Sequence, residues 1–428
     1  MAVSGRLGAL ALFGALVVGL LLPSGTGLLV VGGVLLVLVL VDLAFAGSVR
    51  RLTFTRSGDT SVRLGEPASV ELVVANPGRR RVRGLLRDAW PPSAGAEDRH
   101  RLSVPAGERR RLTTALLPTR RGDRQAFRVT VRSYGPLGLA ARQGSHAVPW
   151  TVRVLPPFGS RKHLPSRLAR LQQLDGRNAV LVRGQGTEFD SLREYVIGDD
   201  VRSIDWRATA RAADVMVRTW RPERDRHVVL VLDTGRVSAG RVGDAPRLDA
   251  AMDAALLLAA LASRAGDRVD LLAYDRRVRA EVRSSSSLLP SLVNAMAPLE
   301  PSLVETDARG MLAEVLLRTR RRALVVLLTG LDAAPLEEGL FPVLSSLTSR
   351  HQLLIASVSD PRVAEMARGR GDAEAVYDAA AASRVLAERQ QVTARLGRRG
   401  VDVVDAVPEE LPPALADRYL ALKAAGRL

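Results

Sequence analysis

Carboxylates are concentrated in one short polar stretch of this 428-residue chain. The acids of that stretch are Glu188, Asp190, Glu194, Asp199, Asp200 and Asp205, and arginines stand beside them at positions 183, 193, 202 and 207. Carboxylate oxygens at this density are the ligands that a hard divalent cation prefers. The same acids could instead form ion pairs with the arginines and so fix two domains together. Because the two kinds of residue occur in similar numbers, we expect ion pairs.

A metal-dependent enzyme is the alternative, with Asp199, Asp200 and Asp205 as its reactive cluster. The residues and motifs of several other catalytic classes are missing from this sequence. The chain has no cysteine, so thiol catalysis and cysteine-bound zinc are excluded. The sequence contains neither an HExxH zinc motif nor a GxSxG nucleophile elbow, and its two lysines, Lys162 and Lys423, do not follow a glycine as a Walker A lysine does. We therefore expect a protein with no catalytic residues and no cofactor.

The segment 227–428 must fold before any of its polar residues can form a site. Strand-like apolar runs alternate there with helical runs, which is typical of a doubly wound, mostly parallel α/β sheet. We expect strands at 227–233, 269–274, 323–328, 352–358 and 401–404, and helices at 247–265, 285–299, 307–320, 335–349, 373–397 and 408–425. Ligands of such folds bind beyond the carboxyl ends of the strands. Asp233 ends the first strand, Asp332 follows the third, and Thr306 lies on a loop between them.

The segment 48–155 has a different pattern of short, alternating runs separated by turn residues, which predicts a small antiparallel β-sandwich. Residues 48–160 carry 21 arginines and 8 acids, a net charge of +13 out of +17 for the whole chain. Anionic lipid headgroups are one possible partner for this charge. A solvated surface without a specific partner is equally compatible with it. Nucleic acid is a weaker alternative, because aromatic residues make up only 4% of the chain.

Two apolar runs precede that segment, at 7–22 and 28–47, with Pro and Gly between them. The second is about 30 Å long as a helix, which matches the hydrocarbon thickness of a bilayer. We expect a transmembrane helical hairpin, with a signal peptide as the alternative for the first run. Asp42 lies near the end of the second run, where we expect its carboxylate to reach water.

Arginines flank the hairpin on both sides, at positions 6, 50, 51 and 56, and the loop between the helices is uncharged. The positive-inside rule then places both ends of the hairpin in the cytoplasm. We therefore expect a multi-pass protein of the inner (plasma) membrane with the bulk of its chain in the cytoplasm. Its domains would be the hairpin at 1–47, the basic β-sandwich at 48–155, a junction at 156–226 and the α/β domain at 227–428.

Two groups of residues resemble known families. Three features of the sequence resemble the von Willebrand factor type A fold. They are a strand that ends in Asp233, a Thr-Asp pair on a later loop and a strand that ends Leu-Leu-Thr. Residues 183–211, RGQGTEFDSLREYVIGDDVRSIDWRATAR, look like the signature of the domain of unknown function 58 family, together with RRG at 120–122 and PLGL at 136–139. The resemblance implies two membrane helices, a β-domain and a type A domain, with no established catalytic activity. It also implies a bacterial chaperone-like or assembly partnership, because relatives are typically encoded beside AAA+ ATPases of the MoxR type.

The type A resemblance implies a Mg²⁺ site, the metal-ion-dependent adhesion site, built from Asp-x-Ser-x-Ser, a loop threonine and a loop aspartate. In this chain the first motif begins at Asp233 and reads DTGRV, so both serines are missing, and Gly330 stands where the loop aspartate is expected. Asp233 and Thr306 remain as candidate ligands, and Asp332 or Asp307 could reach the ion as a further ligand. A hard cation takes about six oxygens, so we do not expect tight Mg²⁺ binding.

The function expected from these features is a membrane-anchored cytoplasmic scaffold or adaptor that binds a partner protein, for which a MoxR-type AAA+ ATPase is the best candidate. The alternatives are the metal-dependent enzyme and a nucleic-acid-binding membrane protein. Candidate interaction residues all lie in the signature, and they are Arg183, Glu188, Phe189, Asp190, Arg193, Tyr195, Asp199, Asp200, Asp205 and Trp206.

Overall fold

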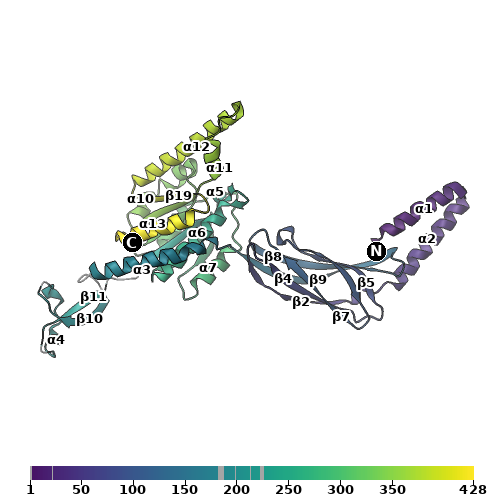
Figure 1. Cartoon of the computed structure of the whole chain (residues 1–428), viewed down its shortest axis with the longest axis horizontal. Coiled ribbons are helices and arrows are strands. Elements are labelled where there is room, and N and C mark those ends of the chain that lie inside the picture. Colours follow the sequence, from purple (N-terminus) through teal and green to yellow (C-terminus); the bar gives the residue numbers. More distant parts are fainter. Residues whose placement is uncertain (1, 22, 182–187, 198, 213, 222–225) are drawn as a thin grey trace. The chain divides into compact units, whose positions relative to one another are not determined.

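The computed structural model of the chain describes residues 2–21, 23–181, 188–197, 199–212, 214–221 and 226–428 (Figure 1). Contacts divide the chain into two compact units, Met1–Pro157 and Phe158–Leu428. Each unit has its own sheets and its own apolar core.

The first unit begins with two apolar helices, α1 (Gly5–Leu21) and α2 (Gly25–Phe45), which lie side by side (Figure 1). They approach closely at Gly14, where a Cβ atom would lie only 2.7 Å from Cγ1 of Val31. Large apolar side chains are exposed along both helices. Within the described part of the chain, the helix that begins at Gly25, with a mean hydropathy of 2.9, is long and apolar enough to cross a membrane, whereas α1 is shorter.

The rest of this unit consists of two sheets, ordered β1-β9-β8-β5-β6 and β2-β4-β7, with β3 paired to β9. All of these pairings are antiparallel except the parallel pairing of β3 with β9. The strands are β1 (Ala2–Val3), β2 (Thr53–Gly58), β3 (Ser61–Arg63), β4 (Ala68–Ala75), β5 (Val82–Ala89), β6 (Arg99–Val104), β7 (Arg109–Leu116), β8 (Gly122–Tyr134) and β9 (Ala140–Leu155). Alternate residues of β4 are buried and pack with residues of β5, β6 and β8 in one apolar cluster, so both sheets share a core.

Asp42 of α2 is fully buried, so the expectation that its carboxylate reaches water is wrong. Its Oδ1 accepts hydrogen bonds from the backbone N–H groups of Leu137 (2.8 Å) and Gly138 (3.3 Å). Its Oδ2 accepts from Leu139 (2.6 Å) and Ala140 (2.8 Å). Four converging N–H groups compensate for the lost hydration of a buried carboxylate. The PLGL motif is therefore the loop that binds the end of the apolar helix.

Two glycines make this loop possible. Gly138 has a φ of +70°, which residues with a side chain rarely adopt. A Cβ atom at Gly135 would overlap the carboxylate and the backbone carbonyl of Asp42. The last turn of α2 is held further by Arg142, whose Nε donates to the Leu43 carbonyl at 2.9 Å, so cations meet the negative end of the helix dipole.

Replacing Asp42 by Ala removes the acceptor of the buried N–H groups of Leu139 and Ala140 and of the part-buried N–H groups of Leu137 and Gly138, and each buried donor left unsatisfied costs about 1–3 kcal/mol. We expect Asp42→Ala to lower the stability of the detergent-solubilised full chain by on the order of 3 kcal/mol in a denaturant titration. Asp42→Asn keeps one acceptor oxygen and should lose less. The control is Asp59→Ala, since the exposed Asp59 carboxylate accepts one N–H bond, from Ser69. Equal losses for the Asp42 and Asp59 alanine variants would contradict this role.

The second unit contains a six-stranded sheet of order β16-β15-β12-β17-β18-β19, parallel except for the antiparallel edge strand β16. Its strands are β12 (His227–Asp233), β15 (Arg268–Tyr274), β16 (Val278–Val282), β17 (Leu324–Leu328), β18 (Gln352–Val358) and β19 (Asp402–Ala406), and a short hairpin is formed by β13 (Arg241–Val242) and β14 (Ala245–Pro246). Strands and helices alternate as the sequence pattern predicts. The central strands β17 and β18 are buried along their whole length, which explains their uninterrupted apolar runs.

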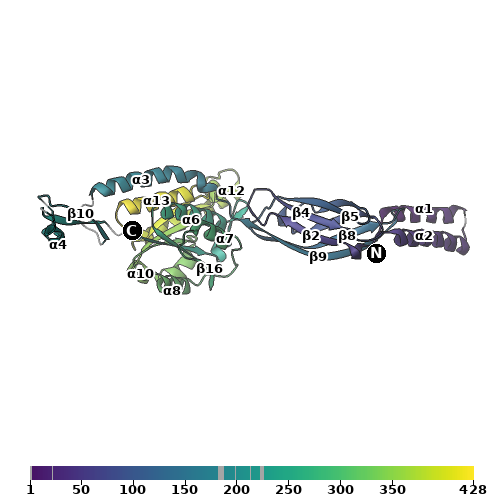
Figure 2. The same ribbon diagram turned by 90° about the horizontal axis from the view of Figure 1, so that it is seen from below.

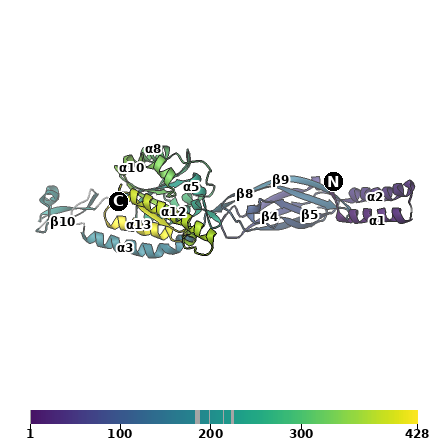
Figure 3. The same cartoon turned by 90° about the horizontal axis from the view of Figure 1, so that it is seen from above.

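Helices cover both faces of the sheet (Figure 2). The helices are α3 (Leu164–Leu181), α5 (Arg236–Ala239), α6 (Arg247–Arg264), α7 (Leu288–Met296), α8 (Ala308–Arg318), α9 (Ala333–Pro335), α10 (Leu344–Thr348), α11 (Pro361–Met366), α12 (Ala373–Gly397) and α13 (Leu411–Ala424). Figures 2 and 3 show α3 and α13 on one side of the sheet and α8 and α10 on the other. Helix α6 is buried over most of its surface because it packs on the sheet and also contacts α3, α7 and α13.

The expectation of a single helix over 335–349 is wrong. The chain there forms α9, a π-helical turn at Leu336–Leu340 and α10. Pro342 lies between the last two and cannot donate the backbone hydrogen bond that a continuous helix needs. The edge strand β16 and helix α3 are further elements that the sequence pattern did not reveal.

A separate two-stranded antiparallel ribbon carries the signature residues, and it is formed by β10 (Glu188–Glu194) and β11 (Met216–Arg221). The residues between the two strands include the short helix α4 (Trp206–Thr209), which lies at one end of the ribbon (Figure 1). The ribbon does not join the six-stranded sheet in the part of the chain that the structure describes.

Candidate functional site

Asp233 is the centre of the site at the carboxyl end of the parallel sheet. It ends β12, and only 4% of its surface is exposed. Its Oδ1 accepts hydrogen bonds from the Thr306 hydroxyl at 2.5 Å and the Gly235 N–H at 2.8 Å. Its Oδ2 accepts a hydrogen bond from the Thr329 hydroxyl at 2.6 Å. The structure thus joins the ends of β12 and β17 and the loop before α8 at one carboxylate, and the sequence reasoning had not assigned a role to Thr329.

Burial raises the pKa of Asp233 above its ordinary value of 3.8. The hydrogen bonds from Thr306, Thr329 and Gly235 oppose that rise, because they stabilise the charged form, and the negative charge of Asp275 adds to it. Asp233 therefore destabilises the fold when it is ionised, relative to the protonated form.

Asp275 follows β15 and organises the neighbouring loops. Its Oδ1 accepts N–H bonds from Arg276 (2.6 Å) and Arg277 (3.2 Å), and its Oδ2 accepts from the Ser302 hydroxyl (2.9 Å). The Arg279 guanidinium lies 3.1 Å from the same oxygen. Burial raises the pKa of Asp275, but these hydrogen bonds outweigh burial and the net shift is downward. Asp275 thus carries a negative charge at neutral pH and fixes the loop that presents Thr306.

The donor set around Asp233 does not fit a six-coordinate Mg²⁺ ion. Gly235 and Val237 provide no side-chain oxygen, and a Cβ atom at Gly235 would overlap the Thr306 hydroxyl. Asp332 lies beside Arg247, with 3.6 Å between its Oδ2 and the guanidinium Nη1. Among the described residues, no group of three or more His, Asp or Glu side chains is arranged to hold a metal ion. Of the three candidate ligands, the structure therefore brings Asp233 and Thr306 into contact, whereas Asp332 lies beside the Arg247 guanidinium.

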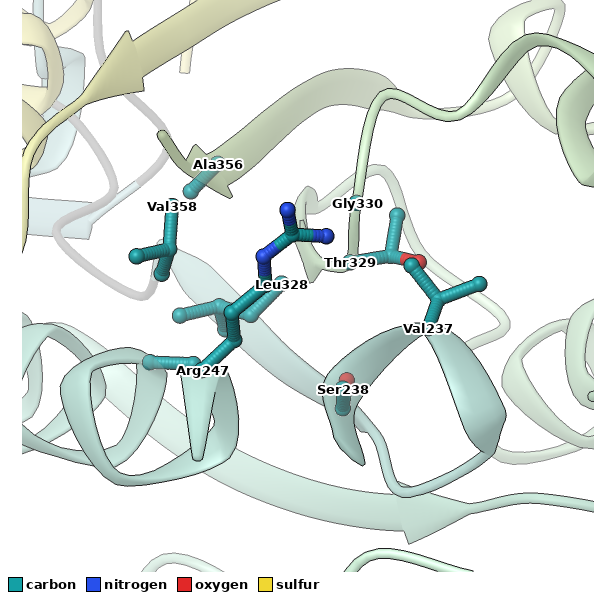
Figure 4. Close-up of a pocket in the computed structure, with 9 residues that line it drawn as sticks. Val237, Ser238, Arg247, Leu328, Thr329, Gly330, Ala356 and Val358 are labelled. Atoms are coloured by element: carbon teal, nitrogen blue, oxygen red, sulfur yellow. The ribbon is translucent and has the colours of Figure 1, made fainter. Parts of the chain in front are cut away.

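A small cavity lies next to this site, between β17, β18 and α6 (Figure 4). Its lining includes Val237, Arg247, Thr329, Gly330 and Val358. The cavity volume is about 10 Å³, enough for one water molecule. Pockets for small-molecule substrates measure roughly 300–1,000 Å³. The space beside Asp233 is therefore too small for a substrate.

The aspartates of the signature form hydrogen bonds and ion pairs with other residues of the ribbon and its connection. Asp199 accepts a hydrogen bond from Arg193 at 2.5 Å and one from the Val196 N–H at 2.9 Å. Asp200 accepts a hydrogen bond from the Arg202 N–H at 2.9 Å. These contacts close the turns that follow β10. The pair of Arg193 with Asp199 agrees with the ion-pair interpretation, but it lies within the ribbon and does not join two domains. Arg202 and Arg207 form no ion pair among the described residues.

Asp205 is the N-cap of α4, where its Oδ1 accepts from the N–H groups of Arg207 and Ala208, both at 3.0 Å. Its Oδ2 accepts from Arg218 Nε of β11 at 2.7 Å. The Ala208 N–H and the Arg218 guanidinium lower the pKa of Asp205 below its ordinary value, so it stays ionised at neutral pH.

The remaining candidates occupy different environments. Glu188 and Phe189 pair with Arg221 and Trp220 of β11 in the strand register, and Asp190 falls at the irregularity that follows Phe189. Tyr195 is half-buried, and its N–H donates to the Val215 carbonyl at 2.8 Å. Trp206, in contrast, is 70% exposed. Arg183 lies outside the described residues.

A family model described as "Protein of unknown function DUF58" matches residues 191–412, from the ribbon to the start of α13. The chain belongs to this family. The matched residues include most of the ribbon and all residues of the Asp233 site.

Two curated relatives of this DUF58 protein are uncharacterized proteins of Mycobacterium bovis and Mycobacterium tuberculosis. Each is 27% identical to it over 202 residues, which cover 45% of this chain and 61% of the relative. The chain thus spans about three fifths of the length of the curated relatives that it matches.

Among solved structures, the VWA domain of SpRpn10 is similar to 46% of this chain, with 94% of that domain covered, a TM-score of 0.28 and 14% identity. The CARDB domain of the PF1109 protein from Pyrococcus furiosus is similar to 26% of this chain, with 91% of that domain covered, a TM-score of 0.20 and 19% identity.

The raised pKa of Asp233 predicts a pH-dependent difference between the protein and its Asp233→Asn variant. Above the folded-state pKa of Asp233 the folded wild type must hold a buried negative charge, which lowers its free energy of unfolding. The amide of the Asn variant carries no charge and avoids this loss. We expect Asp233→Asn to raise the melting temperature by about 3 °C at pH 7.5. The difference should shrink when the pH is lowered to an acidic value, because the wild-type Asp233 takes up a proton and no longer carries the buried charge.

Glu305→Gln is the matched control, since it removes an exposed carboxylate from the same loop cluster, where Glu305 lies 3.3 Å from Arg236. Its melting temperature should follow that of the wild type at both pH values. A destabilised Asp233→Asn variant at pH 7.5, or a difference that does not change with pH, would show that Asp233 is not a costly buried charge.

Proposed function

We propose that this DUF58 protein is a membrane-anchored scaffold whose α/β unit binds a soluble protein partner, a MoxR-type AAA+ ATPase. The observation that carries the proposal is the closed site at Asp233. Both carboxylate oxygens already accept hydrogen bonds from hydroxyl or N–H donors, and the adjoining cavity of about 10 Å³ has room for one water molecule. In a doubly wound fold this edge is where a substrate would bind. Because this end of the sheet has no room for a substrate, it supports a protein that binds its partner through its outer surface, without a metal and without catalysis.

The membrane anchor in this proposal is a hairpin of α1 and α2. The contact between Gly14 and Val31 supports the pairing of the two helices, because small residues let apolar helices approach closely. The attachment of Asp42 to the PLGL loop supports a helix that stays with the mature protein. Arg6 and Arg50 flank the hairpin, which supports a cytoplasmic location of everything after residue 48.

The basic β-unit has a secondary role in the proposal. Its charge of +13 over residues 48–160 would be attracted to the anionic headgroups of the inner leaflet, at about 1 kcal/mol for each cation near the surface. This attraction adds to the anchoring by the helices, and it is expected to weaken as salt is added.

Because the chain has no cysteine, single-cysteine variants report its topology without a background. Ser24 lies in the loop between the two helices and Ser349 lies on the exposed surface of the α/β unit. A membrane-impermeant maleimide should label Ser24→Cys in intact cells. It should label Ser349→Cys only after the inner membrane is permeabilised. Labelling of Ser349→Cys in intact cells would place the α/β unit outside the cytoplasm and refute the proposal.

The partner is tested by binding measurements on purified proteins. The whole chain in lipid nanodiscs should bind a MoxR-type AAA+ ATPase from the same organism, and a chain that ends at Pro157 should not. We expect a Kd in the micromolar range or below, typical of a stable interface. Failure of the full-length protein to bind the ATPase would refute this assignment of the partner.

A further inference from the structure

The signature ribbon exposes large apolar side chains on one connection. This connection joins β10 to β11, and its described residues are 195–197, 199–212 and 214–215. Four of its side chains are mostly solvent-exposed: Val196 (60%), Ile197 (96%), Val201 (63%) and Trp206 (70%). Val217 of β11, by comparison, is 3% exposed. A single exposed apolar side chain is ordinary, but four in a stretch of eleven residues are typical of an interaction site.

The connection is a folded structure that holds these side chains in place. Asp205 N–H donates to the Met216 carbonyl at 2.8 Å, and Ile204 forms a bridge with Val217, so the connection folds back on β11. Asp199 and Asp205 fix the turns on either side of Val201 through the hydrogen bonds described above. The signature aspartates therefore organise the connection, and the apolar side chains remain available.

The charges of the connection favour a protein as its partner over a bilayer or a nucleic acid. Arg202, Arg207 and Arg211 are exposed on the same connection, and none of them forms an ion pair with a carboxylate among the described residues. Over residues 191–218 five arginines balance five acids, so the region has no net charge. A neutral region has little attraction for an anionic bilayer or for nucleic acid, both of which are recognised through net positive charge. Unpaired arginines beside an exposed Trp are typical of the energetic centre of a protein–protein interface.

We propose that the described residues of this connection are the docking surface for the partner protein. The partner presents an apolar groove with carboxylates at its rim. Trp206 and Ile197 enter the groove, and Arg202 and Arg207 meet the carboxylates. This inference rests on the proposed function, since it names the surface through which the ATPase is bound.

The test uses the full-length protein in nanodiscs and the purified MoxR-type ATPase as the probe. We expect Trp206→Ala to weaken the Kd at least tenfold and Arg207→Glu to weaken it severalfold, with a smaller salt dependence than that of the wild type. The matched controls are Tyr377→Ala on α12, which removes another exposed aromatic side chain (78% exposed), and Arg362→Glu on α11. Both controls should stay within twofold of the wild type. An unchanged circular dichroism spectrum and melting temperature would show that the ribbon variants remain folded.

The outcomes separate the two proposals. If the wild type binds the ATPase and the Trp206 and Arg207 variants bind equally well, the docking surface is refuted and the proposed function stands. If the wild type does not bind, the proposed function falls, and this inference falls with it. A further arm measures the binding of detergent-free residues 158–428 to vesicles that contain phosphatidylglycerol, provided that this fragment gives a cooperative unfolding transition. Loss of vesicle binding on Trp206→Ala would assign the connection to the membrane and refute a protein partner.

Discussion

A buried carboxylate is tolerated only where hydrogen-bond donors replace its lost hydration, and this requirement organises the α/β unit around Asp233. Thr306, Thr329 and the Gly235 N–H supply those donors from three separate segments. Asp275 holds the adjoining loop in the position from which Thr306 reaches Asp233. The ends of the strands are therefore joined by polar contacts, and the edge where doubly wound folds bind ligands is filled by the chain's own side chains.

The same principle recurs in the other parts of the chain. Asp42 accepts four backbone N–H groups of the PLGL loop, and Asp205 caps α4 while it pairs with Arg218. In each case a carboxylate that could have been a ligand or a catalyst is used to fix the backbone. The exposed surface of the signature carries large apolar side chains and arginines beside the acids Glu194 and Asp200, and exposed apolar side chains next to arginines are the chemistry of a binding surface.

Much of the second unit could be predicted from the sequence, because its apolar runs have the length and spacing of buried parallel strands. Asp233 and Thr306 were recognised from their positions at strand ends and on a loop. Thr329 was missed as a partner of Asp233, since a threonine after a strand has no distinctive pattern. A single helix was predicted over 335–349, although Pro342 signalled an interruption there. The edge strand β16 was also missed, because its half-exposed residues form no apolar run.

The sequence alone determined the apolar helices, the α/β alternation, the absence of thiol and P-loop chemistry, and membership of the family, because these properties depend on local composition, periodicity and motif. Only the tertiary structure decided what the acids do. An aspartate can bind a cation, cap a helix or accept hydrogen bonds from a neighbouring loop, and which of these it does depends on the hydrogen-bond donors within about 3 Å of its carboxylate. Those donors come from residues distant in the chain, such as Leu139 for Asp42 and Thr329 for Asp233, and folding alone brings them together.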